Sequence, residues 1–239
     1  MHKRIVLLTT LSIVVLLLVS GSAGAQTPKM WVTAGAKGAI GGNYLSKPDD
    51  SSLWVGAFEN GGGGIGGGGG IFGDMRFLNQ HLGFEVDLLF DANKTWCNFN
   101  DIDFILKYTT MRIPILVKAG TQTGIVRISA GIGPEFRIGL SADTDLETDT
   151  GYDLSAFKAR FTAAKRNDVA LTWGVALGFM VSKIEITVDL RFAYNLTLPK
   201  GYLDRTHADP ANNTMLGVEA GHTVDGRIML GAGYVFRSF

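Results

Sequence analysis

Residues 184–196 read Ile-Glu-Ile-Thr-Val-Asp-Leu-Arg-Phe-Ala-Tyr-Asn-Leu, the clearest repeating pattern in the chain. Seven apolar side chains occupy every second position, and the positions between them hold three charged residues. A repeat of two residues is typical of a β-strand, because successive side chains of a strand point to opposite faces. The stretch therefore predicts a strand with one apolar face and one charged face.

The same alternation recurs along the rest of the chain and predicts an all-β protein. Together with 184–196, the expected strands cover residues 32–44, 61–77, 82–91, 102–117, 126–140, 169–181 and 216–236.

Three of these strands carry irregular features. In the strand at 102–117 most apolar residues lie at even positions up to Tyr108 and at odd positions from Met111. A β-bulge near Thr109-Thr110 would bring both sets to one face, because one extra residue reverses the faces. Asp225-Gly226 is a hairpin motif, yet the alternation continues through it, so we expect one long last strand, and a count of ten strands stays open. The run Gly61–Gly70 weakens its strand, and its role stays open too.

The lengths of the connections predict the topology. Three links are short, at 78–81, 120–124 and 182–183, and they alternate with long links. The long links are residues 46–60, 92–100, 141–168 and 197–214. Short periplasmic turns that alternate with longer outer loops are typical of outer-membrane barrels. In the third long link, Leu154, Phe157 and Phe161 have helical spacing, so we expect a short amphipathic helix there.

The first 25 residues have the features of a secretory signal peptide. Lys3 and Arg4 give a positive start, residues 5–19 are mostly apolar, and Ala23-Gly-Ala25 matches a cleavage site. The apolar run is shorter than the roughly 20 residues that a membrane-spanning helix needs. We expect residues 1–25 to be removed near Ala25, and residues 26–239 to form one β-barrel domain.

Alternation alone leaves open which face points inward. A soluble periplasmic barrel of the lipocalin type would keep its apolar face inside, whereas a barrel in lipid exposes that face. Export and the alternating aromatic residues at the C-terminus favour the membrane. The small interior of eight strands also cannot hold every large apolar side chain. The fold class we predict is an all-β, eight-stranded, antiparallel up-and-down transmembrane β-barrel in the bacterial outer membrane.

On this reading the charged faces line the lumen. Six acidic residues (Glu85, Asp87, Asp91, Glu135, Glu185 and Asp189) face six basic ones (Arg112, Lys118, Arg127, Arg137, Arg191 and Arg227). Charges in a narrow interior persist when they are paired. The candidate lumen ion pairs are Glu85, Asp87, Arg127, Glu135, Arg137, Glu185, Asp189 and Arg191. The alternative is a narrow selective channel that uses the same charges.

Several short motifs resemble those of PorT-like outer-membrane β-barrel proteins. They lie in order along residues 82–239, and each is short. The similar segments are Met111–Lys118, Ala130–Phe136, Asn167-Asp168 with Trp173-Gly174 and Leu177-Gly178, Asp189–Tyr194, and Leu230–Phe236. The resemblance implies an outer-membrane barrel and implies no enzymatic activity. The glycine run at 61–70 departs from that family's pattern.

The composition and the remaining motifs exclude several function classes. Loss of Lys3 and Arg4 leaves 20 basic against 22 acidic residues, a net charge of −2, so no basic stripe points to nucleic acid. Cys97 is the only cysteine, and the glycine run lacks the Lys-Ser/Thr ending of a phosphate-binding loop. No histidine has metal-ligand spacing. We expect no cofactor and no metal.

Two further candidates for chemistry are weak. The acidic residues Asp143, Asp145, Glu147, Asp149 and Asp153 could chelate a cation, but they lack the spacing of a calcium-binding loop, so a solvated outer loop is the preferred reading. Ser129 and Ser141 have no histidine on a nearby predicted strand, so we expect no enzyme. The predicted function is a structural or loop-mediated interaction role. The expected partners are outer-membrane lipid, the outer-membrane assembly machinery during biogenesis, and proteins or ligands that contact the outer loops. We expect the protein to be a monomer.

Overall fold

The computed structural model describes residues 30–45, 62–78, 80–99, 102–148, 161–163, 167–197, 203–205 and 223–237. The predicted signal peptide lies outside these ranges, as do Leu154 and Phe157 of the predicted helix. Among the described residues, no helix is long and apolar enough to span a bilayer.

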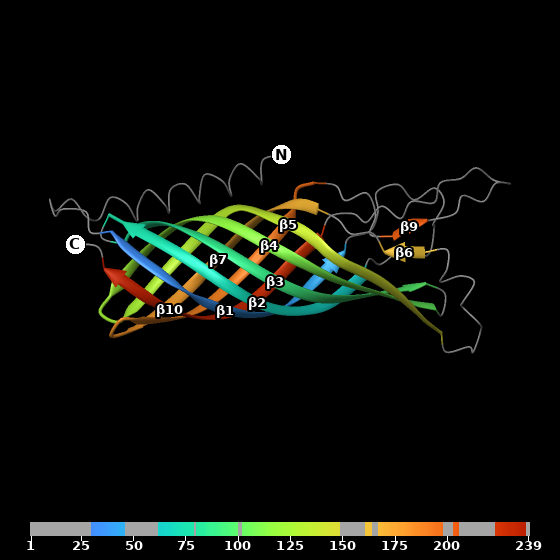
Figure 1. Ribbon diagram of the computed structural model, residues 1–239, viewed down its shortest axis with the longest axis horizontal. Coiled ribbons are helices and arrows are strands. Elements are labelled where there is room, and N and C mark those ends of the chain that lie inside the picture. The colour runs from blue at the N-terminus through green and yellow to red at the C-terminus, as the bar shows by residue number, and fades with distance from the viewer. Residues whose placement is uncertain are drawn as a thin grey trace, which may run out of the picture.

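The described strands confirm the predicted fold class. Eight of them close into a barrel in the order β1-β10-β8-β7-β5-β4-β3-β2, and every neighbouring pair is antiparallel (Figure 1). The barrel strands are β1 (Trp31–Leu45), β2 (Gly62–Phe77), β3 (Leu82–Phe99), β4 (Ile102–Thr123), β5 (Val126–Thr148), β7 (Asn167–Val181), β8 (Ile184–Asn195) and β10 (Thr223–Arg237). Because β1 pairs with β10 from Trp31↔Arg237 to Leu45↔Thr223, the ring has no free edge.

The short turns lie at one end of the barrel, together with Trp31 and Arg237. They join β2 to β3, β4 to β5 and β7 to β8, as predicted. Gly124 has a φ of 60°, the left-handed region that glycine adopts without strain. Figure 1 shows this end of the barrel beside the label of the C-terminus.

At the opposite end, two predicted loops are strands instead. β3 continues to Phe99 and β5 to Thr148, so the predicted loop at 92–100 and the first part of the one at 141–168 are wrong. Residues 92–99 pair with 102–109, and 102–109 pair with 141–148. The backbone hydrogen bonds of this pairing hold residues 92–99 and 141–148 as strands, although their sequences do not show the alternation of apolar and polar residues typical of a strand. We call these three segments the β3–β5 extension; Figure 1 shows it running beyond the ring.

The long connections also contain a short two-stranded ladder. Phe161, the last residue of the predicted helix, lies in one of its strands and not in a helix. Phe161 belongs to β6 (Phe161–Ala163), which pairs with β9 (Leu203–Arg205). β6 lies between β5 and β7 in sequence, and β9 lies between β8 and β10, so the ladder joins two connections. β10 runs through Asp225-Gly226 without a turn, as predicted, while residues 216–222 lie outside the described ranges.

The predicted irregularity near Thr109-Thr110 is present, but the extra residue lies on the neighbouring strand. The pairing of β4 with β5 shifts between Thr109 and Thr110, and Leu140 of β5 is the residue passed over. β4 keeps one register against β3 throughout. Leu106 therefore shares the inner face with Arg112, and the apparent change of parity on β4 came from apolar residues that face inward near the mouth of the barrel.

The outer surface of the ring is apolar and the inner surface is charged. Leu190 is 40% exposed, whereas the next residue, Arg191, is 7% exposed. Other large apolar residues on the outer face include Ile71, Phe84, Val86, Phe90, Val117, Ile128, Phe136, Trp173, Val175, Leu177, Ile186, Val188, Phe192, Ile228, Leu230 and Phe236. This arrangement is the reverse of a soluble binding barrel, so the lipocalin-like alternative does not fit.

Candidate functional site

The interior of the ring holds buried charges from all eight strands. Among the described residues, nine acidic and eight basic side chains are buried there. They are Asp74, Glu85, Asp87, Asp91, Glu135, Asp168, Glu185, Asp189 and Asp225, with Lys37, Arg76, Arg112, Lys118, Arg127, Arg137, Arg191 and Arg227. The eight candidates named from the sequence all lie in this set.

Glu85 lies at the centre of the lumen and is contacted by three cations. Its Oε1 accepts a hydrogen bond from Lys37 Nζ at 2.6 Å, and its Oε2 accepts one from Lys118 Nζ at 2.6 Å. The guanidinium of Arg191 also donates to Oε1. These three cations come from β1, β4 and β8, so one carboxylate of β3 connects strands on different sides of the barrel.

Two further carboxylates complete this central cluster. Asp189 accepts from Lys37 Nζ at 2.9 Å and from Arg191 Nη2 at 2.8 Å. Asp87 forms an ion pair with Arg191 and lies 3.7 Å from Lys37 Nζ. Lys37 and Arg191 therefore each contact all three carboxylates. We define the central cluster as Lys37, Glu85, Asp87, Lys118, Asp189 and Arg191.

A second cluster lies toward the short turns. Arg76 donates to Asp74 at 2.9 Å and also pairs with Glu185. Arg127 Nη1 lies 3.2 Å from Asp74 Oδ2 and 3.5 Å from Glu185 Oε1. Lys118 Nζ, 3.6 Å from Asp74, connects this cluster with the central one.

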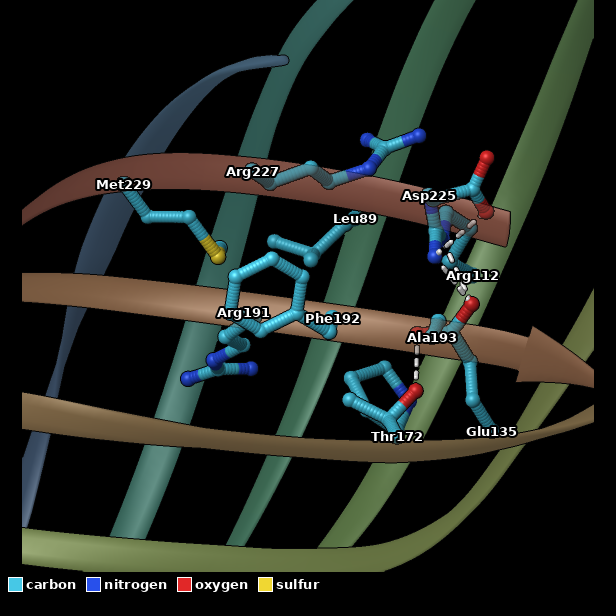
Figure 2. A pocket seen from close by; sticks show the side chains of 11 residues that line it. Leu89, Arg112, Glu135, Thr172, Arg191, Phe192, Ala193, Asp225, Arg227 and Met229 are labelled. Carbon is cyan, nitrogen blue, oxygen red and sulfur yellow. Dashed lines mark hydrogen bonds and ion pairs between the residues drawn. The ribbon is translucent and has the colours of Figure 1, made fainter. Parts of the chain in front are cut away.

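A third cluster lies toward the loop end. Glu135 accepts from Arg137 Nε at 2.6 Å and from the hydroxyl of Thr172 at 2.8 Å, and it pairs with Arg112. Figure 2 shows Glu135 reached by Arg112 and Thr172 from neighbouring strands.

Aspartates extend this third cluster around the barrel. Asp225 lies 2.6 Å from Arg137 Nη2 and 3.4 Å from Arg112 Nη2. Asp91 pairs with Arg112 at 3.3 Å and with Arg227. Asp168 accepts from Asn195 at 2.8 Å. Arg112 and Arg137 therefore each contact carboxylates on more than one strand.

The space between these side chains is small. One void, bounded among others by Leu89, Arg112 and Met229 (Figure 2), has a volume of about 10 Å³, and a second beside Leu116 and Asp189 has about 10 Å³. A void must have at least about 10–15 Å³ to hold one water molecule. Each void therefore has room for about one water, too little for an organic ligand.

Lumen glycines make room for the long charged side chains. A Cβ at Gly178 would lie 2.5 Å from Glu185 Oε1, and a Cβ at Gly231 would lie 2.9 Å from Lys37 Cγ. Both distances are shorter than a van der Waals contact. The glycine content of the chain is thus connected with its charge content, because the charged side chains lie across positions that have no side chain of their own.

Five members of the network were not found by sequence analysis. Lys37, Asp74 and Arg76 lie in the glycine-rich β1 and β2, where the alternation is weak. Asp168 lies one residue before the predicted strand 169–181, and Asp225 belongs to the Asp-Gly pair that resembles a hairpin motif. Alternation would have assigned Lys37 to the inner face, because the apolar residues Val32 and Ile40 occupy the opposite set of positions on this strand.

The chemistry of the site is that of a packed ionic core. In the part of the chain that the structure describes, no group of three His, Cys, Asp or Glu side chains could hold a metal ion. Asp143 and Asp145 of the predicted acidic loop lie on β5, and Asp145 pairs with Lys107 at 2.5 Å. His81 lies at a turn, where Nδ1 is 3.0 Å from the carbonyl oxygen of Gly120. The arrangement can bind strands to one another and fill the interior.

Several solved protein structures resemble this chain at low sequence identity. Neisserial surface protein A is 14% identical, with 87% of this chain and 99% of that chain covered and a TM-score of 0.39. The attachment invasion locus protein Ail of Yersinia pestis is 13% identical, with 88% and 100% covered and a TM-score of 0.34. A major outer membrane protein from Thermus thermophilus is 12% identical, with 88% and 100% covered and a TM-score of 0.41.

The family comparison is the informative one. No curated protein matches the sequence. The family model described as "outer membrane protein beta-barrel domain" matches residues 11–236, which is most of the chain. The closed eight-stranded ring and its apolar outer face agree with that description. The chain belongs to the outer membrane protein β-barrel domain family.

Proposed function

We propose that the mature protein is a non-enzymatic, monomeric barrel of the bacterial outer membrane, with a lumen closed by ion pairs and a loop end that contacts other molecules. The observation that carries this proposal is the filled, charged interior inside an apolar wall. Such a barrel offers no route for solutes through its centre, so its activity lies at its ends.

Three features support the location in the outer membrane. The closed ring pairs its backbone groups between strands, as a hydrocarbon surrounding requires. Residues 1–25 have the features of a signal peptide with cleavage near Ala25, and the motifs at 111–236 resemble PorT-like barrels. Because the chain is exported across the periplasm, we place the start of β1 at Trp31 and the end of β10 at Arg237 on the periplasmic side. The β3–β5 extension then faces the outside of the cell.

The loop end has the ordered structure that recognition requires. The β3–β5 extension carries paired strands beyond Leu140, and the β6–β9 ladder joins two of the connections. Binding sites on strands are positioned more accurately than sites on loops without regular structure. We therefore place protein or ligand contacts at this end, with outer-membrane lipid around the ring and the assembly machinery as a partner during biogenesis.

Cell fractionation tests the location. The protein should be recovered with outer membranes and should resist extraction with salt or alkaline carbonate, because its apolar wall is held by lipid. Its migration on an unheated gel should differ from that of the boiled chain, as a folded barrel resists detergent. Recovery in the soluble periplasmic fraction would contradict the proposal.

Planar lipid bilayers test the closed lumen. The purified protein should give no stable, porin-like conductance, because eight strands leave an interior that side chains fill, whereas aqueous porins use about 16–18 strands. Regular conductance steps of the wild-type protein would instead favour the narrow selective channel.

A further inference from the structure

A hollow lies on the outer face of the barrel, on the loop-end side of the apolar wall. It extends over β1 to β5 and has a volume of about 500 Å³. Pockets that bind small ligands have volumes of about 300–1,000 Å³. Its lining includes Ile40, Ile65, Gly67, Ala92, Lys94, Lys107, Thr109 and Asp143.

The glycine run of β2 produces this hollow. Gly67 lies between Ile40 of β1 and Ala92 of β3 in the register of the sheet. Ile40 and Ile65 are 59% and 53% exposed, so their side chains stand on the outer face as walls. Gly67 has no side chain and Ala92 has only a methyl group. The floor between the two isoleucines is therefore low and apolar.

Two lysines border the hollow on the side of the extension. Lys94 of β3 lies directly opposite Lys107 of β4, a placement of like charges that is unfavourable by itself. Lys107 Nζ is 2.5 Å from Asp145 Oδ2, and Asp143 lies opposite Lys107 on β5. The negative charges of this group are thus on the β5 side, away from Gly67.

Lys94 lies beside the apolar floor, two residues from Ala92 on β3. It lies opposite Ile65 of β2, and its Nζ is 4.9 Å from the centre of the Trp96 ring. Within the described residues no carboxylate forms an ion pair with Lys94. A tryptophan beside a lysine at the edge of an apolar wall is typical of the border between hydrocarbon and head groups.

We propose that this hollow binds an anionic phospholipid, whose head group has no cation to offset the phosphate, with an acyl chain along Ile40, Gly67 and Ala92 and the phosphate at Lys94. The inference rests on the proposed function, because it requires the barrel to lie in a membrane. A lysine donates strong, charge-assisted hydrogen bonds to phosphate oxygens.

Native mass spectrometry of the mature protein, purified from membranes in a neutral detergent, tests the site. The probes are phosphatidylglycerol and phosphatidylcholine with identical acyl chains. The wild-type protein should retain phosphatidylglycerol in preference. Lys94→Gln should lower that preference about tenfold, which corresponds to about 1.4 kcal/mol for one charge-assisted hydrogen bond. Ala92→Leu, which fills the floor, should lower the retention of both lipids.

Lys183→Gln is the matched control. Lys183 lies at a short turn at the opposite end, with its Nζ 5.9 Å from the Tyr234 ring, so it shares the environment of Lys94 without the hollow. Its substitution should leave the preference unchanged. Equal preference in Lys94→Gln and the wild type, or an equal loss in Lys183→Gln, would overturn the lipid site. The location of the barrel is tested separately. If Lys94→Gln still reaches the outer membrane as a folded barrel, the proposed function stands whether or not the lipid site does.

Discussion

One strand, β5, passes through two regions that use charge in opposite ways. Within the ring, Glu135 and Arg137 point into the lumen and are buried. Beyond Leu140, where the pairing shifts by one residue, Asp143 and Asp145 lie on the outer face of the extension. The alternation of charged and uncharged residues is similar in both regions, but the bulge exchanges the faces.

The two regions differ in what their charges can contribute to stability. The side chains of Lys37 and Glu85 are each 1% exposed, whereas those of Lys107 and Asp145 are 48% and 30% exposed. An exposed pair is screened by water and contributes little. A buried charge that loses its partners is costly, because nothing replaces the lost interactions. Closure of the ring, and not the charge pattern alone, therefore gives the ionic pairs their importance.

The largest effect is expected at Glu85, where three cations meet. Glu85→Ala leaves Lys37, Lys118 and Arg191 with fewer carboxylates, and it should lower the free energy of unfolding by about 3–5 kcal/mol, the range for breaking a buried ion pair. Water that enters the lumen would solvate the unpaired cations, so the loss of free energy of unfolding should lie near the lower end of this range. Urea-induced unfolding in lipid vesicles measures it. A loss below about 1 kcal/mol would show that the lumen network behaves like a surface pair.

The next effect is expected on the outer wall. Leu190→Arg places a charge on the lipid-facing side of β8, and it should lower the free energy of unfolding by about 2–4 kcal/mol if Leu190 lies at the mid-depth of the bilayer. Leu196→Arg, one residue beyond the end of β8, should lower the free energy of unfolding by only about 0–1 kcal/mol, because the cost falls near the interface. The same vesicle unfolding experiment compares both variants. Equal losses would contradict the assignment of the outer face to lipid.

A smaller effect separates two glycines of β2. A Cβ at Gly70 would lie 1.9 Å from the carbonyl oxygen of Leu88, whereas a Cβ at Gly73 would have nothing within 4 Å. Gly70→Ala should therefore lower the free energy of unfolding by about 1–3 kcal/mol, the usual cost of overpacking. Gly73→Ala should change it by less than about 0.5 kcal/mol. Similar values for both variants would show that β2 moves away from β3 at little cost.

The sequence predicts the ring well because alternation is a property of each strand by itself. Residues 184–196 indicate both the strand and its charged face, and seven further segments follow the same rule. The lumen residues of β8, such as Glu185 and Asp189, could be assigned by parity alone. What parity cannot reveal is the partner, because Glu85 meets cations from three other strands through the curvature of the barrel.

The remainder required the tertiary structure. Residues 92–99 and 141–148 were expected to be loops, yet each is a strand because β4 lies between them and pairs with both. The shift in pairing lies near Thr109-Thr110, as predicted, but the extra residue is Leu140 on β5. The apparent change of parity on β4 has another cause, because the apolar residues near the mouth of the barrel face inward. The role of the glycine run depends on distances to β3, which no sequence pattern contains.

The smallest effect, and the most direct test of the comparison, is expected at Asp145. Its pair with Lys107 is exposed, so Asp145→Ala should lower the free energy of unfolding by less than about 1 kcal/mol. Salt should abolish what effect there is, because at about 1 M ionic strength the screening length falls to about 3 Å. The loss in Glu85→Ala should persist at the same salt concentration, since its cations are buried away from solvent. Unfolding of both variants at low and high salt measures the difference. If salt instead reduced both losses in the same proportion, the lumen would be as open to ions as the surface of the extension, and the distinction between the two regions of β5 would fail.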